Sequence, residues 1–253
     1  MSPRATRPAV RLNRPDKRNA IDSMMVEALL QSLERAELDA AVRVVAVRGA
    51  GPDFCAGADL EELLASVART PEENARSALH LGEVFLRMRA LPKPVVAVVH
   101  GRAIAGGCGL ATACDLVLAR ADAQLGYPEV RRGFVPAMVM AMLRRIAGEK
   151  VAFDLVATGR LLSAEEARGL GLVSRVLPAG TFEQEVAGVL TGLAGSSPTA
   201  LALIKRQLYE LDGRTFEEGI RLGAEVNALA RTTPDFRTAI AAFLMRSPAR
   251  KGT

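Results

Sequence analysis

The stretch PVVAVVHGRAIAGGCGLATACD, from Pro94 to Asp115, decides the fold of this chain. It begins with five apolar residues, four of them valine, which predict a buried strand. Glycines at 106, 107 and 109 then lead into a helix of small residues over about 108–113. Such a turn directs free backbone N–H groups and the positive end of a helix dipole at one point, which suits an anion or an oxyanion formed during a reaction. Glycines here also permit close packing, so this stretch alone does not choose between structure and function.

The rest of the chain predicts strands alternating with helices as far as residue 177, followed by helices only. This order indicates an α/β core with a helical C-terminal portion. Thr70 followed by Pro71 is a strong helix start, and Asp22 or Ser23 can cap an earlier helix. The sequence SSP at 196–198 is the most plausible boundary, which gives a core of 1–195 and a helical region of 196–253.

Composition narrows the class of protein. The chain has 253 residues, 49% hydrophobic and 24% charged, and no apolar run approaches the roughly 20 residues that a membrane span needs. The N-terminus lacks the apolar core of a secretory signal, and the three cysteines lack metal-ligand spacing. We therefore expect a cytoplasmic protein without a metal site. The net charge of +5 favours an anionic partner, but scattered basic residues and 4% aromatic content make nucleic acid unlikely.

Four motifs in order carry a family resemblance: LNRPDKRNAID at 12–22, FCAGAD at 54–59, YPEVRRGFVP at 127–136 and TGRLLSAEEARGLGLVSRV at 158–176. Together with AGGCGLATACD at 105–115, they resemble the enoyl-CoA hydratase/isomerase (crotonase) superfamily. The resemblance implies a spiral of ββα units, a coenzyme A thioester as substrate and no cofactor beyond it. It also implies a place in fatty acid metabolism.

The resemblance also assigns residues. Two backbone N–H groups would hold the thioester oxygen in an oxyanion hole, and they fall on Ala56 and Gly106. Glu129 would present its carboxylate to the α and β carbons of the acyl chain as acid or base. Candidate contacts to coenzyme A are Lys17, Arg18, Ala58, Asp59, Leu60, Gly107 and Phe243. The side chains of Asp59 and Asp115 are expected to be structural, with Asp59 capping the helix that begins at Leu60.

The chain departs from the family's two-glutamate pattern at one position. Hydratases of that type carry a second glutamate directly after the glycine turn, where this chain has Gly109. A single carboxylate suffices for moving a proton between carbons, as an enoyl-CoA isomerase does. It also supports hydration where another group or the backbone holds the water. Arg131 and Arg132 would fit an acyl chain with its own carboxylate, although paired arginines usually face solvent.

Several alternatives therefore remain open from the sequence. The leading hypothesis is an enoyl-CoA hydratase-like lyase, and the second is a Δ3-Δ2 enoyl-CoA isomerase. A rival of another class is an acyl-CoA- or RNA-binding member with little catalysis. The helical region 196–253 is expected to form a homotrimer, or a hexamer of two trimers, and to cover the coenzyme A. The sequence does not specify the length or branching of the acyl chain, or the pathway.

Overall fold

The computed structural model describes residues 9–245, and it contains two sheets. The larger sheet has five parallel strands in the order β1-β2-β3-β5-β8, namely β1 (Ala9–Leu12), β2 (Val45–Gly49), β3 (Val95–Val99), β5 (Leu116–Arg120) and β8 (Arg175–Leu177). The smaller has β4 (Arg102–Ile104), β6 (Gln124–Gly126) and β7 (Leu161–Ser163), with β4 parallel and β7 antiparallel to β6. The expected α/β class is confirmed.

The two sheets are joined by repeated ββα units. Strand β3 lies in the large sheet, β4 in the small one, and α4 (Gly106–Ala113) follows. Strands β5 and β6 repeat this order before α5 (Met140–Thr158). An earlier turn runs from β2 through Cys55, which bridges to Ala103 of β4, into α2 (Leu60–Ala65). The chain therefore winds as a spiral that brings the ends of successive units together.

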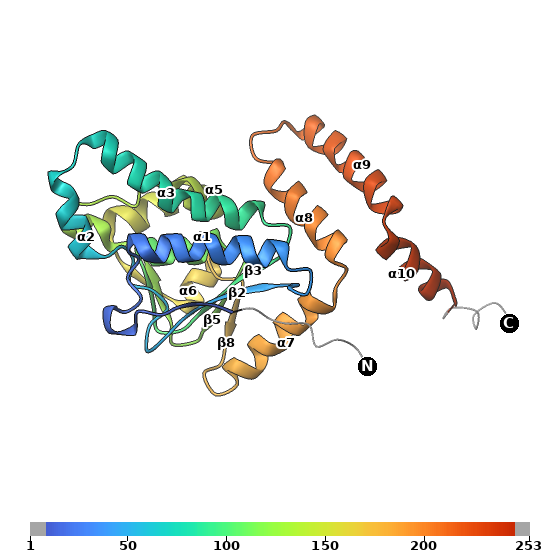
Figure 1. Ribbon diagram of the computed structural model, residues 1–253, viewed down its shortest axis with the longest axis horizontal. Helices are drawn as coiled ribbons and strands as arrows, with labels where there is room; N and C mark the ends of the chain where they lie inside the picture. The colour runs from blue at the N-terminus through green and yellow to red at the C-terminus, as the bar shows by residue number, and fades with distance from the viewer. Residues whose placement is uncertain (1–8, 246–253) are drawn as a thin grey trace.

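Helices cover the sheets and extend beyond them (Figure 1). Around the core lie α1 (Ser23–Leu38), α3 (Pro71–Ala90), α6 (Ala164–Gly169) and α7 (Phe182–Gly195). Then α8 (Pro198–Glu210), α9 (Phe216–Thr232) and α10 (Pro234–Met245) follow, and α9 and α10 project from the body at its right. The predicted caps are confirmed: Asp22 accepts from the Met25 N–H, and Thr70 forms a capping box with Glu73.

The valine strand at the centre of the larger sheet is as buried as its composition predicts. All five residues of β3 are at most 1% exposed, and apolar side chains cover the sheet on both faces. A parallel strand buried on both faces is continuously apolar rather than alternating. No single helix of residues 9–245 is long and apolar enough to cross a membrane.

Candidate active site

The first part of the site is the turn from β4 into α4. Ala105 precedes the helix at φ 55° and ψ −128°, a backbone region that suits glycine rather than alanine. Its own N–H is held by the Gly126 carbonyl of β6 at 2.8 Å. Gly106 opens α4, so its N–H has no acceptor one turn earlier within the helix. The turn therefore leaves the Gly106 N–H available at the positive end of the helix dipole.

The second part is the loop of residues 54–58, which runs beside β4. Cys55 donates its N–H to the Arg102 carbonyl at 3.0 Å and accepts from the Ile104 N–H at 2.9 Å. A methyl group built on Gly107 would lie 2.4 Å from the Cys55 carbonyl oxygen, so only glycine permits this approach. The loop and the first turn of α4 are therefore held in direct backbone contact.

The hydrogen bonding of the N–H groups in this loop differs from what the sequence predicts. The Ala56 N–H donates to the Arg18 carbonyl at 3.0 Å, which disagrees with a free donor at Ala56. The backbone of Ile21 forms hydrogen bonds to both neighbours of Ala58. Its N–H donates to the Gly57 carbonyl, and its carbonyl accepts from the Asp59 N–H. A methyl group built on Gly106 would lie 3.8 Å from the Ala58 nitrogen. Ala58 is thus the loop residue whose N–H lies beside Gly106.

The third part is Glu129, in a short 3-10 helix over Pro128–Arg132. Its side chain is buried, and its Oε2 atom has no hydrogen-bond partner within residues 9–245. Burial raises the pKa of this carboxyl above its ordinary value of 4.5. The pKa of Cys108 in the first turn of α4 is raised to about 11, first by burial and further by the nearby charge of Glu129. The Gly126 carbonyl, three residues before Glu129, accepts the Ala105 N–H, so the segment that carries Glu129 lies beside the turn that carries Gly106.

A buried hydrogen-bond network holds the Glu129 segment against α4. The Tyr127 hydroxyl is 2.9 Å from the Thr112 hydroxyl, which donates to the Cys108 carbonyl at 2.8 Å. Tyr127 is fully buried, and its burial raises the pKa of its hydroxyl well above 10. Because Tyr127 precedes Glu129 by two residues, this network fixes the backbone segment that carries Glu129 relative to the helix.

The two aspartates are structural, as expected. Asp59 caps α2 by accepting from the Glu61 N–H at 2.9 Å, and it pairs with Arg14 at 2.9 Å. The ion pair with Arg14 lowers the pKa of Asp59. Asp115 accepts from the Val95 N–H at 2.7 Å and also pairs with Lys205 at 2.7 Å, a partner that its sequence neighbourhood does not reveal.

The candidate coenzyme A residues are mostly at the surface. Lys17 forms an ion pair with Glu61, and its pKa is raised by that hydrogen bond and charge. Arg18 and Leu60 are exposed, and Phe243 on α10 is 69% exposed. Ala58 and Gly107 border the glycine turn instead. The structure thus places two of the seven residues at the glycine turn, two at the start of α2 (Asp59 and Leu60), two in the basic pair Lys17 and Arg18, and Phe243 on the projecting helix.

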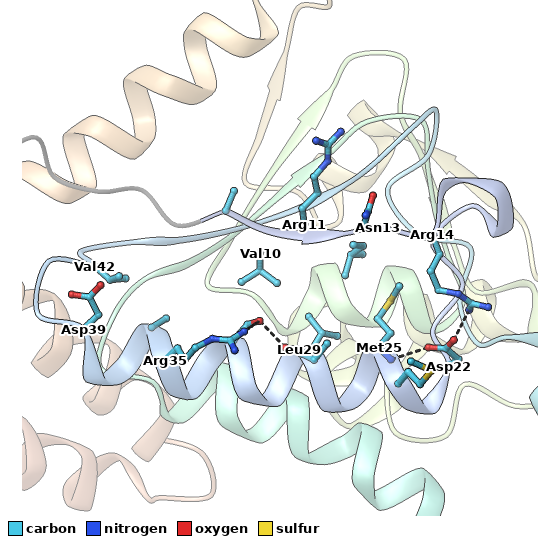
Figure 2. A pocket seen from close by; sticks show the side chains of 16 residues that line it. Val10, Arg11, Asn13, Arg14, Asp22, Met25, Leu29, Arg35, Asp39 and Val42 are labelled. Atoms are coloured by element: carbon cyan, nitrogen blue, oxygen red, sulfur yellow. Dashed lines mark hydrogen bonds and ion pairs between the residues drawn. The ribbon is translucent and has the colours of Figure 1, made fainter.

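A separate hollow lies between β1 and α1 (Figure 2). Its lining includes Val10, Met25, Leu29 and, at one end, Arg14 paired with Asp22 at 3.2 Å. The lining includes neither the glycine turn nor Glu129. Within residues 9–245, no three His, Cys, Asp or Glu side chains are grouped so that they could hold a metal ion.

The fold is a spiral of ββα units, and its site combines a buried glutamate with a helix start that is rich in glycine. Comparison with known proteins identifies the family that has these features. The model of the enoyl-CoA hydratase/isomerase family matches residues 7–250. The chain therefore belongs to the enoyl-CoA hydratase/isomerase (crotonase) family.

Individual relatives agree over nearly the whole length. A protein of Thermus thermophilus, whose name groups it with the enoyl-CoA hydratases, is 46% identical over 239 residues, which cover 94% of each chain. The 2,3-dehydroadipyl-CoA hydratase of Escherichia coli is 32% identical, over 95% of this chain and 93% of the relative. The solved structure of an enoyl-CoA hydratase from Mycobacterium smegmatis superimposes with a TM-score of 0.90 at 30% identity, and 95% of each chain is covered. The chain is thus similar to proteins named as hydratases of CoA thioesters.

Proposed function

We propose that this chain is an enoyl-CoA hydratase-like enzyme that acts on an α,β-unsaturated acyl-CoA thioester through an oxyanion hole and a single glutamate. The observation that carries the proposal is the buried carboxyl of Glu129, with an unpartnered oxygen, on a segment that is hydrogen-bonded to α4 through Tyr127. Burial of a carboxyl without a hydrogen-bond partner costs stability, and groups with such perturbed pKa values cluster at functional sites.

We assign the two oxyanion donors to the N–H groups of Ala58 and Gly106. Both lie at the contact between the 54–58 loop and α4, whereas the Ala56 N–H is already bonded to Arg18. As the thioester carbonyl becomes an enolate, its oxygen gains negative charge, and fixed donors stabilise that charge more than the neutral carbonyl. Each such donor typically contributes about 3 kcal/mol to the transition state.

Glu129 carries out the proton transfers in the proposed hydration. Its carboxylate accepts a proton from water while the water oxygen bonds to the β carbon and the enolate forms. Glu129 then gives this proton to the α carbon, which restores the carbonyl and the ionised carboxylate. One carboxylate therefore closes the cycle without a second acid or base.

The second candidate is a Δ3-Δ2 enoyl-CoA isomerase, which the presence of Gly109 favours. No carboxylate can extend from this position, so Glu129 acts alone. It would take a proton from the α carbon of a 3-enoyl thioester and return it to the γ carbon, with the same oxyanion hole holding the dienolate. This reaction needs no water molecule.

A paired assay distinguishes these functions. Purified protein is tested for hydration of crotonyl-CoA and for conversion of a 3-enoyl-CoA to its 2-enoyl isomer, with Glu129→Gln as the matched variant. We expect activity in at least one arm and a loss of at least 100-fold in the variant. Retention of activity within a few-fold would remove Glu129 from its role, and silence of the wild type in both arms would refute the proposed function.

We also propose that the chain assembles as a homotrimer or hexamer through its C-terminal helices. Those helices carry exposed apolar side chains, including Ile204, Leu208, Phe216, Ile220, Phe236, Ile240, Phe243 and Leu244. Figure 1 shows α9 and α10 projecting away from the body, where a neighbouring copy can reach them. In this arrangement Phe243 of one copy would cover the coenzyme A bound to the neighbouring copy. Lys17 and Arg18 of that neighbouring copy would contact the phosphates of the same coenzyme A. Analytical ultracentrifugation would test this assembly, and a monomer at micromolar concentration would refute it.

Three free and buried cysteines fit a reducing cytoplasmic location, which we propose for the protein.

A further inference from the structure

The Ala58 N–H, one of the two proposed oxyanion donors, takes its direction from a β-bridge. Residues 21 and 58 form this parallel bridge, in which the Ile21 N–H donates to the Gly57 carbonyl at 2.7 Å. The Gly57 carbonyl and the Ala58 N–H belong to one peptide group, and no peptide bond of residues 9–245 is cis. In a planar trans peptide these two groups point in opposite directions. The bridge therefore directs the Ala58 N–H away from Ile21.

The same peptide group lies beside the start of α4. A methyl group built on Gly57 would lie 3.2 Å from the Gly106 nitrogen, and one built on Gly106 would lie 3.8 Å from the Ala58 nitrogen. Gly57 has a φ of 92°, and glycine leaves its neighbouring peptide groups free to rotate. The hydrogen bond from Ile21, rather than the backbone of Gly57, therefore sets the angle between the two proposed donors.

The guanidinium group of Arg14 holds both segments of this bridge. Its Nη1 atom donates to the Ala20 carbonyl at 2.7 Å, and its Nη2 atom lies 2.9 Å from Asp59 Oδ2. The Ala20 carbonyl and the Ile21 N–H again belong to one trans peptide group and point in opposite directions. Arg14 thus grips the first of two peptide groups that are hydrogen-bonded head to tail, and the second of them ends in the Ala58 N–H.

This double contact depends on the geometry of arginine. A guanidinium group is planar and presents five N–H donors in a fixed fork, so it can hold a carbonyl and a carboxylate together. Its Nη1 atom is also 3.2 Å from Asp22, as Figure 2 shows, and the carboxylates of Asp22 and Asp59 are both largely buried. The Arg14 backbone N–H donates to Oδ1 of buried Asn19 at 3.0 Å. Arg14 is therefore anchored through its backbone as well as its side chain.

We infer that Arg14 is a positioning residue, which orients the Ala58 N–H of the proposed oxyanion hole through two successive peptide groups. This inference rests on the proposed function. Removal of an oxyanion donor slows the chemical step about 100- to 1,000-fold. Loss of Arg14 misaligns a donor instead of removing it, so the expected loss is smaller. It falls on kcat more than on KM, because an aligned donor stabilises the enolate more than the neutral thioester.

The first test measures kcat and KM of the wild type, Arg14→Met and a control, Arg11→Met. The substrate is whichever of crotonyl-CoA and the 3-enoyl-CoA the wild type converts faster. Methionine offers no N–H donor, and Arg11 is an exposed arginine of β1 in the same segment. We expect kcat to fall at least ten-fold in Arg14→Met with KM within three-fold, and both to stay within two-fold in the control. A kcat within two-fold of the wild type in Arg14→Met, or equal losses in both variants, would overturn the inference.

A second test reads the oxyanion hole directly, since a purely structural role would not change how a bound thioester is polarised. Hydrogen bonds to the carbonyl oxygen lower its stretching frequency in infrared difference spectra. The probe is butyryl-CoA, isotope-labelled at its thioester carbonyl, which has no double bond to hydrate or move. At a temperature where circular dichroism shows all three proteins folded, we expect a full shift in the wild type and Arg11→Met and less than half of it in Arg14→Met.

The outcomes separate this inference from the proposed function. An equal shift in the wild type and Arg14→Met would overturn the inference alone. A wild type that binds butyryl-CoA without a shift and is silent in both arms of the paired assay would refute it together with the proposed function. Where Arg14→Met loses its fold, Arg14→Lys takes its place, because lysine keeps the positive charge but has a single nitrogen instead of the fork. The shift should be reduced there too, and a full shift would overturn the inference.

Discussion

The ion pair of Lys205 with Asp115 offers the sharpest test of how the helical region is attached to the core. Lys205 of α8 is 7% exposed, and its Nζ atom lies 2.7 Å from Asp115 Oδ2. It also donates to the carbonyls of Met88 and Lys93 at 2.6 and 3.0 Å. We predict that Lys205→Met, which keeps the apolar stem of the side chain, destabilises the protein strongly.

The magnitude follows from what remains after the change. Removing one partner of a buried pair costs about 3–5 kcal/mol when the other charge is left uncompensated. Asp115 keeps the Val95 N–H and the Tyr209 hydroxyl, at 2.7 and 2.8 Å, so the loss should fall at the lower end, about 3 kcal/mol. For a chain of this size, about 3 kcal/mol lowers the melting temperature by about 6–12 °C.

The assay is thermal and urea unfolding followed by circular dichroism at one protein concentration, because the chain has no tryptophan to report by fluorescence. Lys150→Met, a change at an exposed lysine of α5, is the control and should move the midpoint by less than 2 °C. A loss below about 1 kcal/mol in Lys205→Met would refute the reasoning. So would equal losses in both variants.

Three further outcomes are expected. Ala105→Gly should raise the free energy of unfolding by about 1 kcal/mol, because glycine adopts a φ of 55° without strain; no gain in a urea titration would argue against that strain. Gly107→Ala should destabilise by about 3 kcal/mol through its clash with Cys55, whereas Gly188→Ala, with open space around it in α7, should not; equal effects in the same titration would count against the clash. Glu129 has a higher pKa in the native protein than in the unfolded chain. Protonation of Glu129 therefore adds to the free energy of unfolding below about pH 4.5, and this contribution is lost as pH rises through the native pKa. Glu129→Gln should therefore gain stability over the wild type as pH rises through this window, and a constant difference between pH 4 and 8 would contradict the raised pKa.

The fold was predictable where local chemistry decides it. A valine strand before a glycine turn, a threonine cap before Pro71 and an aspartate cap at Asp22 all form as their residue types indicate. The kink of α5 falls at Gly148, whose φ of 76° suits glycine. The smaller sheet was missed, because its three strands have three residues each and are too short for a readable alternation.

The site was predictable only in part. The motif around Glu129 indicated a functional carboxylate, but its missing hydrogen-bond partner is visible only in three dimensions. Whether Ala56 or Ala58 has the free N–H depends on a hydrogen bond to Arg18, 38 residues before Ala56, which no local pattern reveals. The contact of Val139 with Gly109 likewise joins positions 30 residues apart. Sequence patterns identify which residues matter, whereas tertiary contacts decide which atoms are free.

The glycine contacts have a consequence for how this enzyme can change over evolution. A methyl group on Gly57 would meet the Ala105 side chain at 2.8 Å, and one on Gly107 would meet the Cys55 carbonyl at 2.4 Å. Side-chain variation is therefore excluded where the thioester oxygen is expected to bind. Variation remains open at exposed positions of the segment that carries Glu129, such as Val130 and Arg131. A lineage with this architecture can therefore change its surface around the site, while the backbone geometry of the glycine turn is inherited nearly unchanged.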